Sequence, residues 1–157
     1  MRKSVKSIVF VFVLGLIAIL RIFSAFTITY PSLNSLPAKY TYEMAENNGD
    51  VIMGDQGKSN FEKMNVFYDN VNHRKDDMIR VTGFTTEGGV IILDVIYKSG
   101  NLTVTQDNTR DGYSDRKITT YKAIKITKDN KIAANGNELT YYTAQLENGD
   151  MYTLAAG

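Results

Sequence analysis

MIRVTGFTT at residues 78–86 and VIILDVIYK at residues 90–98 are the two stretches that decide the fold. Both are rich in β-branched and aromatic residues, and their apolar side chains recur in steps of two, the period of a half-buried strand. Only Glu87, Gly88 and Gly89 separate them, and a short glycine-containing connection of this kind is typical of a hairpin. The sequence therefore predicts two neighbouring antiparallel strands.

The period of two continues to the C-terminus. Turn signals rich in glycine and asparagine separate the later apolar runs, at residues 99–101, 135–136 and 148–149. The strands predicted after the hairpin cover residues 102–106, 118–127, 138–146 and 151–154. No proline follows Pro37, which suits an uninterrupted antiparallel sheet. We therefore expect a meander of five to six strands.

A helix is expected before the hairpin. Residues 59–62 (SNFE) match a capping box, in which a serine and a glutamate side chain bind free N–H groups. Apolar residues then recur at steps of three and four, namely Phe61, Met64, Phe67, Tyr68 and Val71. This spacing predicts one helix over about residues 60–72. The predicted fold class is α+β: one helix packed on an antiparallel β-meander of five to six strands, preceded by an N-terminal membrane segment.

The first 29 residues differ in composition from the rest of the chain. Residues 1–7 carry three positive charges, and residues 8–20 (IVFVFVLGLIAIL) are all apolar, a pattern typical of a secretory signal. Residues 8–28 are long enough to span a bilayer with the single charge of Arg21, and no small-residue cleavage site follows. We therefore expect a protein of the cell membrane, with its N-terminus cytoplasmic and its domain extracytoplasmic, or a secreted domain if the leader is cleaved.

The sequence divides into three regions. Residues 1–29 are expected to form the signal or anchor segment, residues 30–45 a tether, and residues 46–157 the α+β domain. Pro31 and Pro37 are the only prolines, and they favour extended conformations in their neighbours. A stiff connection between anchor and domain is the interpretation of this middle region.

Composition excludes several kinds of site. The 157 residues include no cysteine, which excludes disulfides, thiolate metal sites and cysteine nucleophiles. His73 is the only histidine, so a zinc site with several histidines cannot form within one chain. From residue 30 onward, 14 Lys and Arg stand against 17 Asp and Glu. This mildly acidic domain is not expected to bind nucleic acid.

Several short motifs resemble those of one known family. They are residues 48–51 (NGDV), 77–82 (DMIRVT), 85–88 (TTEG), Asp94 and 107–111 (DNTRD). Together they resemble DUF4362, a domain of unknown function found in lipoproteins of Bacillus-type bacteria. The resemblance covers about residues 46–126. It implies a location at the cell envelope and a fold, and it implies no activity.

The chain departs from that family pattern at its cysteines. The resemblance implies a lipid-modified cysteine after the leader, where residues 24–26 of this chain read SAF. It also implies a cysteine before Lys122 and another near the C-terminus, where this chain has Tyr121 and ends in AAG at residues 155–157. Any anchoring must therefore come from the hydrophobic segment itself.

The loop at residues 107–115 contains the one candidate metal site, and it is weak. Oxygen-bearing side chains occur there at Asp107, Thr109, Asp111 and Asp115. This order resembles the first nine positions of an EF-hand loop. Ile118 stands where a bidentate glutamate is required, and Arg110 adds a positive charge. We therefore expect no specific metal and no cofactor, and interpret the loop as one held by side chain–backbone hydrogen bonds.

Asp94 interrupts an apolar strand, so its carboxylate needs a partner or access to water. A three-residue turn after the first strand of the hairpin would place Asp94 opposite Thr82 and diagonal to Arg80. This register predicts a structural Arg80–Asp94 pair. A two-residue turn would move the side chains to opposite faces and remove the contact.

Basic residues are concentrated in one later stretch of the chain: Arg116, Lys117, Lys122, Lys125, Lys128 and Lys131. On a strand, Lys122 and Lys125 would point to opposite faces, so these residues form no single basic stripe. Lysines that protect the edge of a sheet explain this stretch better than an anion site does.

The leading functional hypothesis is a non-catalytic, envelope-associated binding or accessory module with an unidentified envelope or extracellular partner. The sequence contains no P-loop and no G-x-S-x-G motif, and we expect no enzyme. One alternative is a small carboxylate-dependent hydrolase, which would draw its acid and base from Glu87, Asp94, Asp107 and Asp111. Another is an exclusion or immunity protein of a mobile element.

Overall fold

The computed structural model describes residues 29–54, 57–133 and 136–157. Its first elements are a 3₁₀ helix, η1 (Leu33–Ser35), and the helix α2 (Tyr42–Asn48). They are followed by β1 (Val51–Gly54), α3 (Glu62–Asn72) and β2 (Asp77–Phe84). The remaining strands are β3 (Val90–Lys98), β4 (Asn101–Arg110), β5 (Ile118–Ile132), β6 (Glu138–Leu146) and β7 (Met151–Ala156).

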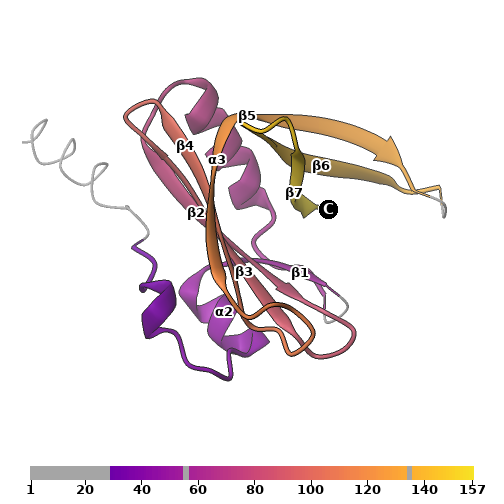
Figure 1. Ribbon diagram of the computed structural model, residues 1–157. Coiled ribbons are helices and arrows are strands. Elements are labelled where there is room, and N and C mark those ends of the chain that lie inside the picture. Colours follow the sequence, from indigo (N-terminus) through magenta and orange to yellow (C-terminus); the bar gives the residue numbers. More distant parts are fainter. Residues whose placement is uncertain (1–28, 55–56, 134–135) are drawn as a thin grey trace, which may run out of the picture.

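The seven strands of the described residues form one sheet, in the order β1 to β7. β1 runs parallel to β2, and each later neighbouring pair is antiparallel. Figure 1 shows that the sheet is curled, because β5 bends away from β4 and carries β6 and β7 with it. The register of β5 against β6 shifts between Ala123 and Lys125, and such a bulge increases the local twist of a strand.

The inner face of the curled sheet carries the main hydrophobic core. From α3, Met64 and Phe67 are buried against it. The buried side chains that the sheet contributes include Ile79, Val81, Leu93, Val95, Val104, Ile126, Tyr142, Ala144 and Leu154. Alternate residues of β2 and β3 point into this core, as the period of a strand requires. This packing fixes α3 on the sheet.

The outer face of β2 and β3 is covered by the residues that precede β1. We call residues 30–41 the strap, because they lie along this face. The buried side chains between the strap and the sheet are Tyr30, Leu33, Leu36, Tyr40, Ala45, Ile52, Phe84, Val90 and Ile92. The region expected to form a tether is thus packed on the domain through its apolar residues.

The predicted fold class, one helix on a meander of five to six strands, is wrong. The described residues contain seven strands and two α-helices, and the first strand pairs in parallel. The missed elements, α2 and β1, are seven and four residues long, which is too short for a periodic pattern to appear. β1 depends instead on pairing with β2, which it reaches through the crossover that contains α3.

The expected N-terminal membrane segment, residues 8–28, lies outside the described residues. Within the part of the chain that the structure describes, no helix is both long and apolar enough to cross a membrane. The first described residue, Thr29, leads directly into the strap.

The predicted capping box before α3 is also wrong. The helix begins at Glu62, and Ser59 instead forms a bridge with β1. Its hydroxyl donates to Glu46 Oε1 at 3.0 Å. Asn60 adopts a φ of 57°, and its side chain donates to the carbonyl of Asp50 at 2.9 Å. Contacts with β1 and α2 therefore replace the local N-cap that the sequence predicts.

Candidate functional site

Five polar residues are buried together on the outer face, beneath the strap. We call them the buried polar cluster: Tyr40, Asp50, Arg80, Thr82 and Asp94. Arg80 and Thr82 are alternate residues of β2 and therefore share a face. Asp94 lies across from Arg80 on β3, and Asp50 immediately precedes β1, which pairs with β2. Two adjacent strands, the residue before a third strand and the strap thus supply the cluster.

Arg80 and Asp94 form a two-pronged ion pair. Arg80 Nε donates to Asp94 Oδ1 at 2.6 Å, and Nη2 donates to Oδ2 at 2.9 Å. The two residues are directly opposite rather than diagonal, because the connection between the strands spans residues 85–89 instead of three residues. The Arg80 side chain is fully buried, so the pair offsets a large desolvation cost.

Arg80 also holds the start of the strap. Its Nη2 donates to the carbonyl of Pro31 at 2.7 Å, and its guanidinium carbon lies 5.2 Å from the centre of the Tyr30 ring. The Tyr30 hydroxyl reaches the carbonyl of Gly49 at 3.4 Å. Burial raises the pKa of Tyr30 to about 12, so the hydroxyl remains a neutral donor. The guanidinium therefore joins β2, β3 and the strap.

Asp50 connects the end of the strap to the sheet. Its Oδ2 accepts hydrogen bonds from Thr82 Oγ1 at 2.6 Å and from the Tyr40 hydroxyl at 2.9 Å. Burial raises the pKa of Asp50 to about 6, although these two bonds and the charge of Arg80 oppose the shift. The Tyr40 hydroxyl in turn accepts from Asn48 Nδ2 at 2.8 Å. The cluster thus links the strap, α2 and β2.

Two charged atoms of the cluster have no hydrogen-bond partner among the described residues: Asp50 Oδ1 and Arg80 Nη1. The two groups carry opposite charges, and the attraction of Arg80 lowers the cost of keeping the Asp50 carboxylate buried. Both side chains are fully buried, so bulk solvent does not reach these two unpaired atoms.

Arg110 forms the second attachment of the strap, which the sequence analysis missed. Its Nε donates to the carbonyl of Pro37 at 2.9 Å. Nη2 donates to the carbonyls of Leu33 at 3.2 Å and Leu36 at 2.9 Å. Nη1 contacts the carboxylate of Asp107 and the hydroxyl of a neighbouring threonine. These contacts engage all the N–H groups of a guanidinium.

The four residues considered as metal ligands are engaged in other contacts of the chain. Asp107 and Thr109 are joined by a hydrogen bond of 2.6 Å. Asp111 accepts from a backbone N–H two residues ahead at 3.0 Å, and Asp115 pairs with Lys117. Over residues 29–54, 57–133 and 136–157, no group of three or more His, Cys, Asp or Glu side chains is arranged to hold a metal ion.

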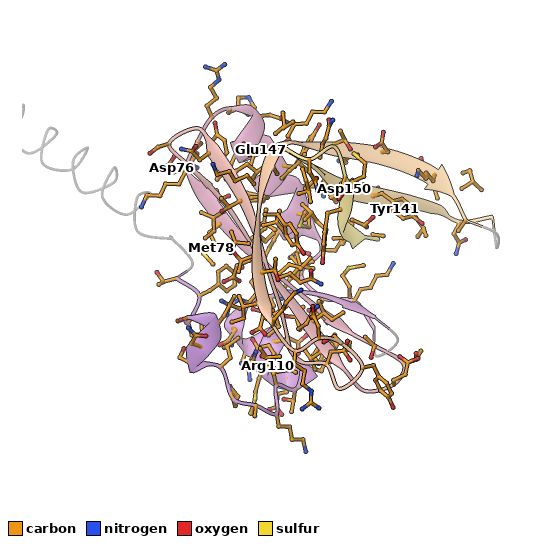
Figure 2. The ribbon with its side chains drawn as sticks, viewed as in Figure 1. Asp76, Met78, Arg110, Tyr141, Glu147 and Asp150 are labelled. Atoms are coloured by element: carbon orange, nitrogen blue, oxygen red, sulfur yellow. The ribbon has the colours of Figure 1, made fainter. Side chains whose placement is uncertain are left out.

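A hollow of about 390 Å³ lies where the strap meets the connection between β2 and β3. It is lined by residues 38–42, Phe84, Gly88, Val90 and Arg110. Figure 2 places Arg110 at this end of the molecule. Since the N–H groups of Arg110 already bind the strap and Asp107, the hollow offers no free guanidinium to an anion.

These features define a small, mostly β domain, in which a curled sheet carries buried charges that bind the chain's own strap. Residues 48–136 match the family model of a domain of unknown function, DUF4362. The chain therefore belongs to the DUF4362 family. Comparisons with curated proteins and with solved structures gave no match.

Three of the motifs that carry the family resemblance supply residues to the two strap attachments. The NGDV and DMIRVT motifs supply Asp50 and Arg80 to the buried polar cluster, and the DNTRD motif supplies Arg110. The TTEG motif forms the connection between β2 and β3, where Thr85 Oγ1 accepts from the backbone of Gly89 at 2.9 Å. In this protein the motifs organise the outer face and hold the strap on it.

Proposed function

We propose that this protein is a non-catalytic binding or accessory module, held at the cell envelope by its N-terminal apolar segment. The observation that carries the proposal is the engagement of the buried charged groups in holding the strap. The side chains best placed to perform chemistry are thereby committed to structure. This bonding favours a stable domain that binds a partner through its surface and performs no catalysis.

The carboxylates favour binding over hydrolysis. A carboxylate-dependent hydrolase needs two carboxyl groups with separated pKa values in one accessible cleft. Asp94 and Asp107 each pair with an arginine, and a hydrogen bond with Thr86 lowers the pKa of exposed Glu87. Burial raises the pKa of Asp50, but its side chain lies beneath the strap with no exposed surface. None of these four carboxylates is placed as a general acid within reach of a substrate.

The strap supports the envelope location. It begins at residue 30, directly after the apolar segment of residues 8–28. Arg80 and Arg110 bind the carbonyls of Pro31 and Pro37. An anchor at residues 8–28 would therefore hold the domain close to the membrane surface, with little free chain between them.

Fractionation of bacterial cells that express the full chain tests the location. The full chain is expected in the membrane fraction, where it should resist extraction by salt, since apolar burial is insensitive to ionic strength. Protease added to intact cells should degrade the domain. A matched chain that begins at residue 29 should be soluble. Recovery of the full chain in the soluble fraction, or protection of the domain from external protease, contradicts the proposal.

Cross-linking on intact cells tests the binding role. The full chain should form a defined adduct with another envelope protein, and the adduct should persist in Glu87→Gln and Asp111→Asn variants. Turnover of a model ester or glycoside that these substitutions abolish would instead support a carboxylate-dependent hydrolase.

A further inference from the structure

β5 is paired on only one side over its second half. β4 pairs with β5 from Ile118 to Ala123 and no further. β6 continues to pair with β5 as far as Ile132. Figure 1 shows β5 and β6 projecting from the body as an arm. We call residues 126–132 the β5 edge, because among the described residues no strand pairs with the side of this segment that faces away from β6.

The hydrogen-bond pattern identifies the backbone groups that lie on the open side. The backbone N–H of Glu147 donates to the carbonyl of Lys122 at 3.1 Å, and that of Ala133 donates to Asn137 at 2.8 Å. In an antiparallel pair, alternate residues bond to the neighbour. Residues 125, 127, 129 and 131 therefore bond to β6. The N–H and C=O groups of residues 126, 128, 130 and 132 point outward, along roughly 20 Å of strand.

The charge of this strand is opposite to that of the rest of the domain. Between residues 122 and 132 the chain has four lysines and one aspartate, a net charge of +3. Residues 30–157 as a whole carry −3, which leaves −6 on the remainder. Two apolar side chains of this strand are also exposed, since Ile124 and Ile132 are 62% and 71% accessible.

The lysines disfavour pairing with a second copy of this chain and favour pairing with an acidic segment. A second copy paired along the same edge would bring the lysines of two identical strands together, and like charges across a strand pair are destabilising. Lysines on an edge are a common defence against such self-association. An extended segment rich in Asp and Glu would instead gain from these charges. Exposed main-chain groups together with a complementary charge are what strand addition uses.

We propose that the β5 edge binds an extended, acidic segment of a partner protein, which adds as a further strand beside β5. The inference rests on the proposed binding role and names its surface and the chemistry of its partner. Main-chain bonds to residues 128, 130 and 132 provide the affinity. Lys125 and Lys131 are exposed on the strand and provide the preference for acidic side chains.

The test uses the full chain in mild detergent and a fluorescent peptide of about seven residues that alternates glutamate with valine. The matched control peptide alternates lysine with valine. Saturable binding of the acidic peptide, and of it alone, is expected in the submillimolar range. Its affinity should fall at least about tenfold in a Lys125→Glu/Lys131→Glu double variant, since the charge of the strand then changes sign.

Amide hydrogen exchange tests the geometry independently of affinity. In the free protein the amides of residues 127, 129 and 131 should exchange slowly, and those of residues 128, 130 and 132 should exchange fast. The acidic peptide should slow the second set. This alternation is the signature of an added strand, and diffuse electrostatic attraction does not produce it.

Asn130 offers a matched pair of variants. Its backbone N–H points outward, and its exposed side chain accepts only from the hydroxyl of Thr140 in the described structure. Asn130→Pro removes the outward donor at an edge position that tolerates proline, whereas Asn130→Ala keeps it. Binding should be lost in Asn130→Pro and retained in Asn130→Ala, with both variants showing the same circular dichroism spectrum as the parent.

Three results overturn the proposal. One is the absence of saturable binding at millimolar acidic peptide. Another is equal binding by the Asn130→Pro and Asn130→Ala variants, which would mean attraction by charge without strand addition. The third is a concentration-dependent dimer that Asn130→Pro dissolves, which would make a second copy the occupant. If the β5 edge fails while the full chain still forms its envelope adduct in cells, the binding role stands and only this surface is wrong.

Discussion

Replacing Arg110 with alanine is expected to release the strap from the sheet. Arg110 makes three bonds to strap carbonyls, and each such bond contributes about 1 kcal/mol after exchange with water. The substitution also leaves Asp107, whose side chain is fully buried, without its cation, which costs about 1–3 kcal/mol more. The free energy of unfolding should therefore fall by about 4–6 kcal/mol.

The assay needs a global and a local reading. Urea unfolding of the full chain in mild detergent, followed by circular dichroism, measures the change in stability. Trypsin cleavage after Lys39 in the strap, followed by mass spectrometry under native conditions, measures release of the strap itself. Arg116→Ala is the matched control, because Arg116 lies in the connection that follows Arg110, between β4 and β5, and is exposed. Arg110→Lys should lie between the control and Arg110→Ala, since an ammonium keeps the charge and loses the planar fork.

A particular combination of results would refute this reasoning. If Arg110→Ala lowers the urea midpoint but leaves the rate of cleavage after Lys39 at the parental value, Arg110 acts only through Asp107. Faster cleavage in the Arg116→Ala control would likewise show that the connection between β4 and β5 as a whole, and not the bonds from Arg110 to the carbonyls, positions the strap.

Three further predictions follow from single side chains. The pKa of Asp50 is raised from 3.8 to about 6, so its contribution to stability is present at low pH and is lost as the pH rises from about 4 through about 6. In unfolding experiments across that range the free energy of unfolding of the parent should fall by roughly 2–3 kcal/mol through this group, and that of the Asp50→Asn variant should not. Tyr152→Ala should cost about 1–3 kcal/mol in thermal unfolding, because the ring lies 6.1 Å from that of Tyr121, whereas Tyr152→Phe should be nearly neutral. Ser59→Ala should lower the free energy of unfolding, measured by denaturation, by less than about 1 kcal/mol, since the hydroxyl makes an exposed bond to Glu46 and caps no helix. A larger loss would restore the N-cap interpretation.

Local patterns located the elements whose packing has a period. The apolar stripe at steps of three and four lies on α3, and its Met64 and Phe67 are buried in the inner core. The alternating runs of the hairpin became β2 and β3, with Val81 and Val95 on the inner face. These patterns are visible because one face of each element is buried, so the sequence repeats with the geometry of that face.

Turn length was less predictable, and it changed the register. Phe84 pairs with Val90, so residues 85–89 form the connection, although only Glu87, Gly88 and Gly89 carry a turn signal. Thr85 looks like a strand residue by composition, but its hydroxyl accepts the Gly89 N–H and closes the turn. Such a side chain–backbone bond competes with strand pairing and leaves no periodic mark.

The strap was missed because the arginines bind it through its backbone carbonyls and not through side chains. Every residue has a carbonyl, so a sequence cannot indicate which ones Arg80 and Arg110 bind. The available signal was the apolar spacing of Tyr30, Leu33 and Leu36, which a solvated tether does not need. Two prolines in the same stretch favoured the interpretation as a spacer. Proline suits a strap equally well, because it lacks a backbone N–H that would need a partner.

The two attachments of the strap and the β5 edge lie at different ends of the molecule. In Figure 1 the strap and η1 lie on the left, and the β5–β6 arm projects to the right. Figure 2 places Arg110 near the strap end and Tyr141 out on the arm. A domain held at a membrane through its strap would therefore present the β5 edge on the side away from residue 30. In that arrangement the two attachments of the strap would limit rotation of the domain, whereas a loose tether would let the arm turn toward the membrane, where an added strand could not reach it.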